Sequence, residues 1–335
     1  MISHSFELMG KREFVVICGQ VGLGDLGVTG FFGVSGYLLF SSAKRLNSKN
    51  YFIHRFARIF PAFWVTLMFT SFILNPIINL IVTDKVSIDW SGLNGNITYV
   101  LKNFTTVIFQ HQIGSSPVNI ASHKAINGSL WTLAPEICCY LFLWGVVHFF
   151  KRHATSIFFG IMLLTISLQT IYHYSEELTL NQRILSSNTL LCAFSTGALL
   201  GSVQKGKWIQ ERTFSIALCA LLSCVALVST KNWFFAGQIF WVIAVLVIAM
   251  RPCTWRFVEW LQRNDYSYGI YLLHYPMILV AATYIEAKDL NGSETAAFLS
   301  TTYLALLLFA ALMWVGLESK ILAIVKRKTF NSGPI

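Results

Sequence analysis

Long blocks of apolar residues constrain this chain more than any other feature of its sequence. The blocks are about 17 to 25 residues long, the length that a helix needs to cross a hydrocarbon core of roughly 30 Å. Of the 335 residues, 55% are hydrophobic and 12% are charged, against about 25% charged residues in soluble domains. The mean hydropathy is +0.60. We therefore expect an all-α, polytopic transmembrane helix bundle, with residues 1–335 forming a single membrane domain.

Nine apolar segments are predicted to be membrane-spanning helices. They are residues 20–42, 56–82, 128–150, 154–174, 188–204, 213–230, 233–250, 266–286 and 296–326. The longest polar connection, residues 83–127, has aromatic and amide side chains (Trp90, Tyr99, Phe104 and His111 among them) that suit either a sugar or an interfacial lid.

Basic residues cluster after every second apolar segment. The positive-inside rule places these clusters, and the C-terminus with them, on the cytoplasmic side of the membrane. The net charge of +10 is then explained mainly by topology, and no nucleic-acid partner is expected. The clusters are Lys44, Arg45, Lys49, Arg55 and Arg58; Lys151, Arg152 and His153; Lys205, Lys207 and Arg212; Arg251, Arg256 and Arg263; and Lys326, Arg327 and Lys328.

Nine spans with a cytoplasmic C-terminus place the N-terminus outside. The opening stretch "MISHSFELMGKREF" is too short and too polar to cross a membrane, and it has no signal-peptide pattern. We therefore expect a tenth helix ahead of Met1, so that the chain begins at the end of its own first helix.

The cysteines suggest neither a disulfide framework nor a zinc site. None of the seven falls in a Cys-x-x-Cys pair, and most lie inside apolar blocks. Buried, unreactive thiols and no bound metal are the expectation.

Ionisable side chains inside the spans are candidates for function, because each costs at least about 2.5–3.5 kcal/mol near a helix centre. Arg55 and Arg58, three residues apart, share one helix face and could bind phosphate through their guanidinium groups. They could equally anchor the helix at the membrane surface.

Two further candidates lie deeper. Glu136 falls about two turns into a span and needs a raised pKa or a partner on another helix; the alternative to a functional role is a structural hydrogen bond to a neighbouring helix. His274 falls about 12 Å into a span at 1.5 Å per residue, beside Tyr268, Tyr271 and Tyr275 at helical spacing. These tyrosines could form one polar seam next to the histidine.

Two features are less informative by themselves. His4 would stand at the outer end of the expected preceding helix, but a histidine near a terminus means little alone. Glycines recur every third residue from Gly24 to Gly36, a spacing that lets membrane helices approach closely.

Taken in order, these stretches resemble the integral membrane acyltransferase 3 family, the bacterial O-acyltransferases of surface polysaccharides. The stretches that carry the resemblance are "ISHSF", "GVTGFFGVSGYLL", "RFARIFPAFW", "GSLWTLAPEICCY" and "YSYGIYLLHYPMI". They run from residue 1 to about residue 320. The family has ten helices, which agrees with the expected helix ahead of Met1. Thr29 stands where the family has an aspartate, and no proline follows Glu318.

The resemblance implies O-acetyl transfer from cytoplasmic acyl-CoA, most often acetyl-CoA, to a hydroxyl of an extracytoplasmic carbohydrate. Arg55 and Arg58 would hold the phosphates of the donor, and His274 would position or polarise the thioester. His4 would be the general base, and Glu136 would orient His4 or bind the sugar. Trp131, Tyr268 and Tyr271 would contact substrate.

Two alternatives remain open at this point. Glu136 and His274 could form the proton relay of a transporter or flippase, although no internal repeat supports this. The chain could also be an inactive acyltransferase that lacks its first helix. Direct attack and a covalent acyl-enzyme are both compatible with the residues.

Overall fold

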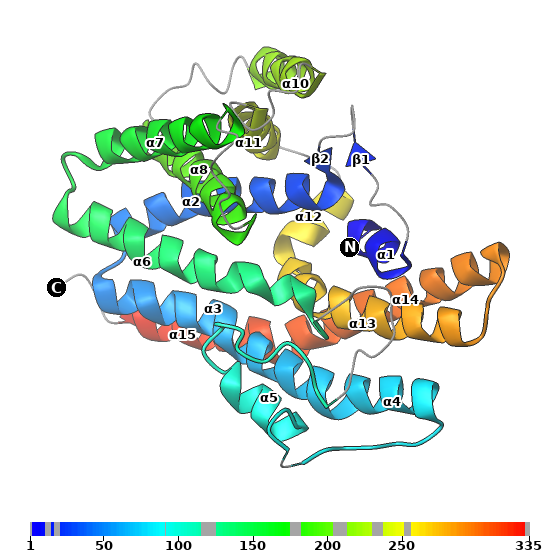
Figure 1. Ribbon diagram of the computed structural model, residues 1–335. Helices are drawn as coiled ribbons and strands as arrows, with labels where there is room; N and C mark the ends of the chain where they lie inside the picture. Colours follow the sequence, from blue (N-terminus) through cyan, green and yellow to red (C-terminus); the bar gives the residue numbers. More distant parts are fainter. Residues whose placement is uncertain are drawn as a thin grey trace. The chain divides into compact units, whose positions relative to one another are not determined.

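The computed structural model describes residues 2–10, 15–16, 21–90, 92–114, 125–174, 182–203, 213–229, 237–250 and 256–331. Within these ranges the chain is almost entirely helical, which confirms the expected all-α class (Figure 1). Two short antiparallel strands, β1 (Val15–Val16) and β2 (Val21–Gly22), are the exception.

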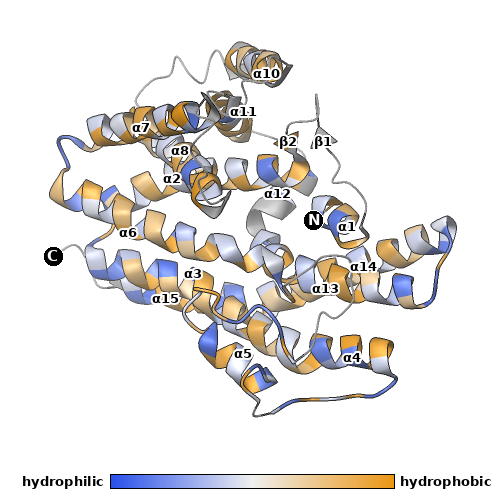
Figure 2. Cartoon of the chain, in the orientation of Figure 1, coloured by the Kyte–Doolittle hydropathy of each residue, from blue (hydrophilic) through white to orange (hydrophobic). Residues whose placement is uncertain are grey.

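Among the described residues, seven helices are long and apolar enough to cross a membrane. They span Leu23–Arg45, Ser48–Thr83, Gly128–Phe149, Ala154–Tyr172, Ile184–Val203, Ser267–Ala287 and Gly292–Thr329. Two shorter apolar helices cover Leu218–Leu227 and Gln238–Ala249. These nine correspond to the nine predicted segments, so the chain is a multi-pass helical membrane protein. In Figure 2 the turn between α6 and α7 and the turn between α13 and α14 are blue, which places polar residues at helix ends.

The chain divides into two compact units. The first consists of Met1–Arg12, Phe52–Ala134 and Thr254–Ile335, and the second of Glu13–Tyr51 and Pro135–Cys253. The elements that supply the first unit are α1 (Ile2–Leu8), α3 (Ser48–Phe69), η1 (Thr70–Leu74), α4 (Asn75–Thr83), α5 (Asn96–Lys102), η2 (Gly128–Thr132), α12 (Arg256–Arg263), α13 (Ser267–Ala287), α14 (Gly292–Met313), η4 (Trp314–Glu318) and α15 (Ser319–Asn331). The second contains β1, β2, α2 (Leu23–Arg45), α6 (Leu133–Phe149), α7 (Ala154–Tyr174), α8 (Gln182–Val203), α10 (Thr213–Ser229) and α11 (Gln238–Ala249).

Two of the predicted spans are longer than expected because their helices continue into polar sequence. The segment predicted at 56–82 begins at Ser48, and the one predicted at 296–326 runs from Gly292 to Asn331. The start of α14 is set by Asn291, whose side chain accepts from the backbone N–H groups of Ser293 and Glu294. This is a capping box, which satisfies donors that a helix start otherwise leaves unpaired.

Parts of several predictions lie outside the described residues. They include the first residue of the segment predicted at 20–42, the last residues of those at 188–204 and 213–230, the start of that at 233–250, and residues 115–124 of the polar connection. The basic residues Lys205, Lys207, Arg212 and Arg251 lie there too. Cys18 and Cys253 also lie there. The five cysteines in the described part, Cys138, Cys139, Cys192, Cys219 and Cys224, form no disulfide.

The connection after α4 is held in shape by buried amide side chains. Asn96 donates to the Ser71 carbonyl and accepts from the Asp89 amide (3.0 Å). Trp64 of α3 stacks on Phe104 with ring centroids 4.4 Å apart. Tyr99 is 1% exposed and therefore packs as core, whereas Trp90 is 58% exposed. A role of this connection as a sugar-binding surface or a lid stays a prediction.

In the second unit, α2 and α8 approach each other through glycines. A Cβ on Gly36 would meet the Phe194 carbonyl oxygen at 2.1 Å, and one on Gly197 would meet the Gly33 oxygen at 1.9 Å. Because these are backbone atoms, the helices would have to separate to admit a methyl group. The close approach explains this part of the glycine series as packing.

Gly36→Ala is therefore expected to destabilise the protein by about 1–3 kcal/mol, the usual cost of overpacking. Gly27→Ala on the same helix is the matched control, because a Cβ there meets nothing within 4 Å. Helix propensity alone would make both changes favourable by about 1 kcal/mol. Thermal unfolding in detergent should thus show a lower Tm for Gly36→Ala and an equal or higher Tm for Gly27→Ala. Equal behaviour of the two variants would contradict the packing account.

Candidate active site

Seven of the eight predicted site residues lie in the first unit. They are His4, Arg55, Arg58, Trp131, Tyr268, Tyr271 and His274; Glu136 belongs to the second unit. The structure brings five of the seven, all except Arg55 and Trp131, into one row along α13. Arg55 lies half-buried on the turn of α3 before Arg58.

Arg58 joins three elements of the first unit. Its Nη2 lies 2.5 Å from Asp265 Oδ2, at the entrance to α13, and its Nη1 lies 3.3 Å from Glu318 Oε2, at the end of η4. Its guanidinium also lies over the ring of Tyr268, 5.5 Å from the centroid. The Tyr268 hydroxyl donates to the carbonyl of Ile59 (2.9 Å). Arg58 is thus fixed by two carboxylates and an aromatic face.

The pairing of Arg58 with Asp265 and Glu318 did not follow from the sequence. The partners lie 207 and 260 residues away along the chain. The sequence does indicate that Glu318 needs a partner, because it is an acidic residue inside an apolar span. It does not indicate which residue that partner is. His54, one turn earlier, contacts Thr329 through Nε2 (3.1 Å), where α15 runs beside α3 (Figure 1).

A row of rings leads from Arg58 along α13. The Tyr268 and Tyr271 centroids are 6.5 Å apart, and those of Tyr271 and His274 are 6.1 Å apart. His274 then stacks on His4 of α1, with centroids 5.3 Å apart and an interplanar angle of 29°. Since Tyr268 and His274 are six residues apart, the row covers about 9 Å of helix. Two of the three tyrosines predicted to form a polar seam, Tyr268 and Tyr271, therefore lie in this row between Arg58 and His274, whereas Tyr275 packs against His4.

Pro276 explains how the loop before α6 attaches to α13. A proline inside a helix has no N–H, so the carbonyl four residues earlier, at Leu272, loses its helical donor. The Asn127 amide donates to this oxygen instead (3.0 Å). Gly128 is required beside it, because a Cβ there would lie 2.7 Å from the Tyr275 ring. Asn127 and Gly128 are residues whose role the sequence did not reveal.

The tyrosine in the middle of the row is held by the same segment. The Tyr271 hydroxyl donates to the Ser129 carbonyl and contacts the Thr132 hydroxyl. Ser129 Oγ in turn donates to the Tyr271 carbonyl (3.3 Å). Trp131, between Ser129 and Thr132 in the sequence, is 42% exposed. Its predicted contact with substrate stays a prediction.

The tautomer of His274 follows from its partners. Nδ1 lies 2.7 Å from the Tyr271 carbonyl and 3.2 Å from the Ile270 carbonyl. Carbonyl oxygens only accept, so Nδ1 carries the proton and neutral Nε2 is an acceptor. In this form the buried imidazole can receive a hydrogen bond from a hydroxyl. Because Nε2 carries no proton in this tautomer, it cannot donate a hydrogen bond to a thioester oxygen. This tautomer agrees with the positioning role predicted for His274 and not with the polarising role.

His4 is arranged in a similar way but is more accessible. Its Nδ1 lies 3.0 Å from Glu7 Oε2, one turn along α1, and its side chain is 30% exposed. A carboxylate accepts the Nδ1 proton and leaves Nε2 with a lone pair. The ring also packs edge-on against Tyr275, with centroids 5.2 Å apart. Two imidazoles, each with an Nε2 that can accept a hydrogen bond, therefore lie together.

Glu136 is buried in the first turn of α6 and accepts a hydrogen bond from Tyr140, one turn further on the same helix. Because Tyr140 lies on the same helix, this contact is not the hydrogen bond to a neighbouring helix that the sequence left as an alternative. The predicted pairing of Glu136 with His4 stays a prediction.

The comparisons with known proteins identify the family. A family model described as an acyltransferase domain (acyltransferase 3) matches residues 1–317. The chain belongs to this acyltransferase family. Over 286 residues it is 28% identical to an O-acetyl transferase of Shigella phage Sf6, and the match covers 83% of this chain and 80% of that relative. No solved structure matches the chain significantly. The resemblance inferred from five short motifs is thus confirmed.

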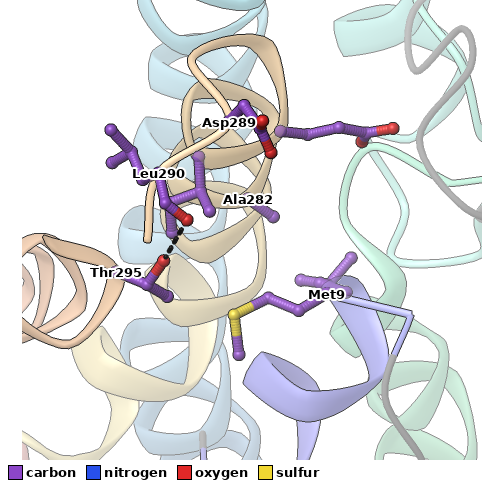
Figure 3. Close-up of a pocket in the computed structure, with 8 residues that line it drawn as sticks. Met9, Ala282, Asp289, Leu290 and Thr295 are labelled. Atoms are coloured by element: carbon purple, nitrogen blue, oxygen red, sulfur yellow. Dashed lines mark hydrogen bonds between the residues drawn. The ribbon is translucent and has the colours of Figure 1, made fainter. Parts of the chain in front are cut away.

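The acyltransferase also has a cavity at the C-terminal end of α13 (Figure 3). Its volume is about 350 Å³. It is lined by Leu8, Met9, Ala282, Ile285, Glu286, Asp289, Leu290 and Thr295. None of the eight predicted site residues lines it. Across the described ranges, the acyltransferase has no cluster of three or more His, Cys, Asp or Glu side chains able to hold a metal ion.

Proposed function

We propose that the chain is an O-acetyltransferase that moves an acetyl group from cytoplasmic acetyl-CoA to a hydroxyl of an extracytoplasmic carbohydrate. The observation that carries the proposal is the row of side chains from Arg58 through Tyr268, Tyr271 and His274 to His4. It joins an anion-binding group to a pair of imidazoles within one unit of the chain. The family and the relative named as an O-acetyl transferase agree with an ester product.

The donor end of the row is Arg58. A guanidinium has five N–H donors, and the two contacts to Asp265 and Glu318 use one on each Nη. The remaining donors suit a phosphate oxygen of coenzyme A. Basic residues near the start of α3, including Arg55 and Lys49, add positive charge on the side predicted to be cytoplasmic.

The reacting end is the histidine pair. The acceptor hydroxyl oxygen attacks the thioester carbonyl carbon while its proton passes to Nε2 of His4. The tetrahedral intermediate then collapses, the C–S bond breaks, and the proton moves from His4 to the departing sulfur, which gives the ester and free coenzyme A. His274 Nε2 accepts a hydrogen bond and orients the hydroxyl. A positioned base of this kind contributes about 10²–10⁴-fold to the rate.

The proposal is tested on surface glycans from cells with and without the gene. Mass spectrometry should find a two-carbon ester, removable by mild base, that is lost in the deletion strain and restored by the full chain. In parallel, the purified protein in lipid nanodiscs should release coenzyme A thiol from acetyl-CoA when the glycan is present. An unchanged ester profile together with no thiol release would refute acetyl transfer.

Glu7 gives a prediction about the base. With Glu7→Gln the side chain can still accept the Nδ1 proton of His4, but it no longer stabilises an imidazolium by charge. His4 also faces His274 and Tyr275 from α13. We expect Glu7→Gln to lower the rate of thiol release from acetyl-CoA, because the imidazolium that forms during transfer loses its counter-charge.

Glu7→Ala should lower the rate further than Glu7→Gln, because it also removes the hydrogen bond that orients the ring. Asp289→Asn serves as a control for general loss of negative charge near α1. If both variants release thiol from acetyl-CoA as fast as wild type, Glu7 does not act on the base.

A further inference from the structure

Glu318 is the most buried charged group in the row's surroundings. Its side chain is 2% exposed, whereas Asp265, the other carboxylate on Arg58, is 43% exposed. Removing a carboxylate from water costs several kcal/mol unless a fixed cation is nearby. A buried anion and a half-exposed one on the same guanidinium therefore cannot be equivalent: Glu318 is held by the protein, and Asp265 remains in contact with solvent.

The position of Glu318 depends on a change of helix type. The buried positions of α14 are Leu306, Ala310 and Met313, which are four and three residues apart, as an α-helix requires. The next buried position is Glu318, five residues after Met313. In an uninterrupted α-helix, residue 317 would occupy the inward face instead. A spacing of five is that of a π-turn.

The π-turn is visible in the backbone hydrogen bonds. η4 covers Trp314–Glu318, and the N–H of Ser319 donates to the carbonyl of Trp314, five residues earlier. Such turns are rare and are frequent at functional sites. Gly316, within the turn, has no heavy atom within 4 Å of its Cβ position, so no close approach of the backbone requires a glycine there. What the turn achieves is to rotate Glu318 toward Arg58.

We propose that Glu318 is a positioning residue for the donor, which orients Arg58 toward a phosphate of coenzyme A, and that the π-turn supplies the register for this. The inference rests on the proposed function. Glu318 holds Nη1, the Tyr268 ring covers the guanidinium plane, and the Tyr268 hydroxyl is bonded to the backbone one residue after Arg58. The guanidinium plane is thereby fixed in two directions. Glu318 itself does not touch the donor.

The test compares two donors, acetyl-CoA and acetyl-pantetheine, which lacks the phosphates. The readout is kcat/KM for acetyl-CoA divided by kcat/KM for acetyl-pantetheine. This ratio does not depend on how much of a variant is folded. Glu318→Gln should lower this ratio by roughly tenfold or more, because a less well oriented Arg58 binds the coenzyme A phosphate more weakly. In an Arg58→Ala background the same change should lower it no further, since Glu318 acts through Arg58.

A matched pair of length variants tests the register. Deleting Gly316 leaves Glu318 four residues after Met313, so a regular α-helix would still direct it toward Arg58. Inserting one alanine after Gly316 makes the spacing six and turns Glu318 away. We expect the deletion to keep the donor ratio and the insertion to lower it as Glu318→Gln does.

The outcomes separate the two proposals. If wild-type protein uses acetyl-CoA but Glu318→Gln leaves the donor ratio unchanged, the positioning role is refuted and the acetyltransferase remains. The same conclusion follows if Glu318→Gln lowers the ratio equally with and without Arg58. If wild-type protein uses neither donor, the proposed function fails.

Discussion

Replacing His4 by alanine is expected to lower the rate of acetyl transfer by about 10²–10⁴-fold, the usual contribution of a positioned base. His4 is the more accessible imidazole of the stacked pair, and Glu7 fixes its Nδ1 proton. Without it, no group at this position can take the proton of the acceptor hydroxyl. The measurement is thiol release from acetyl-CoA in the presence of the glycan, with the protein in nanodiscs.

Two controls accompany His4→Ala. His153→Ala removes a histidine from the exposed turn between α6 and α7 and should leave the rate unchanged. His4→Ala with His274→Ala should cost little more than His4→Ala alone, because groups that act as a unit are not additive. A fully active His4→Ala variant, or a double variant whose losses multiply, would contradict the assignment of the pair.

The second large effect is expected for Arg58→Ala. Removing the guanidinium leaves Glu318 buried without its cation, and breaking a buried pair on one side costs about 3–5 kcal/mol. The same change removes the proposed phosphate ligand. We therefore expect a Tm lower by several degrees in detergent. We also expect a higher KM for acetyl-CoA.

The double variant Arg58→Ala with Glu318→Ala separates these consequences. Removing both charges abolishes the uncompensated anion, so much of the lost stability should return. Use of acetyl-CoA should not return with it, because the phosphate ligand is still absent. If the double variant is as unstable as Arg58→Ala alone, burial of Glu318 is not the cause of the instability.

The sequence predicted the candidate residues better than it predicted their partners. Histidine, tyrosine and arginine stood out because ionisable and hydroxyl groups are rare in apolar segments. Of the seven predicted site residues in the first unit, all except Trp131 and Arg55 lie in the row along α13. Asn127, Gly128 and Ser129 did not stand out, since small polar residues are common at helix starts. Their role appears only when Pro276 is seen to leave the Leu272 carbonyl without a helical donor.

The sequence by itself determined the class of the protein, the number and approximate limits of its apolar helices, and its family. These follow from local properties, because the thickness of the hydrocarbon core sets a length and each backbone bond of a helix closes within the same segment. Only the tertiary structure decided that Arg58 meets Asp265 and Glu318, and that His4 stacks on His274. The contact of Arg58 with Glu318 depends on helix register, and the π-turn at Trp314–Glu318 changes that register by one residue. No local pattern in "WVGLE" predicts this turn.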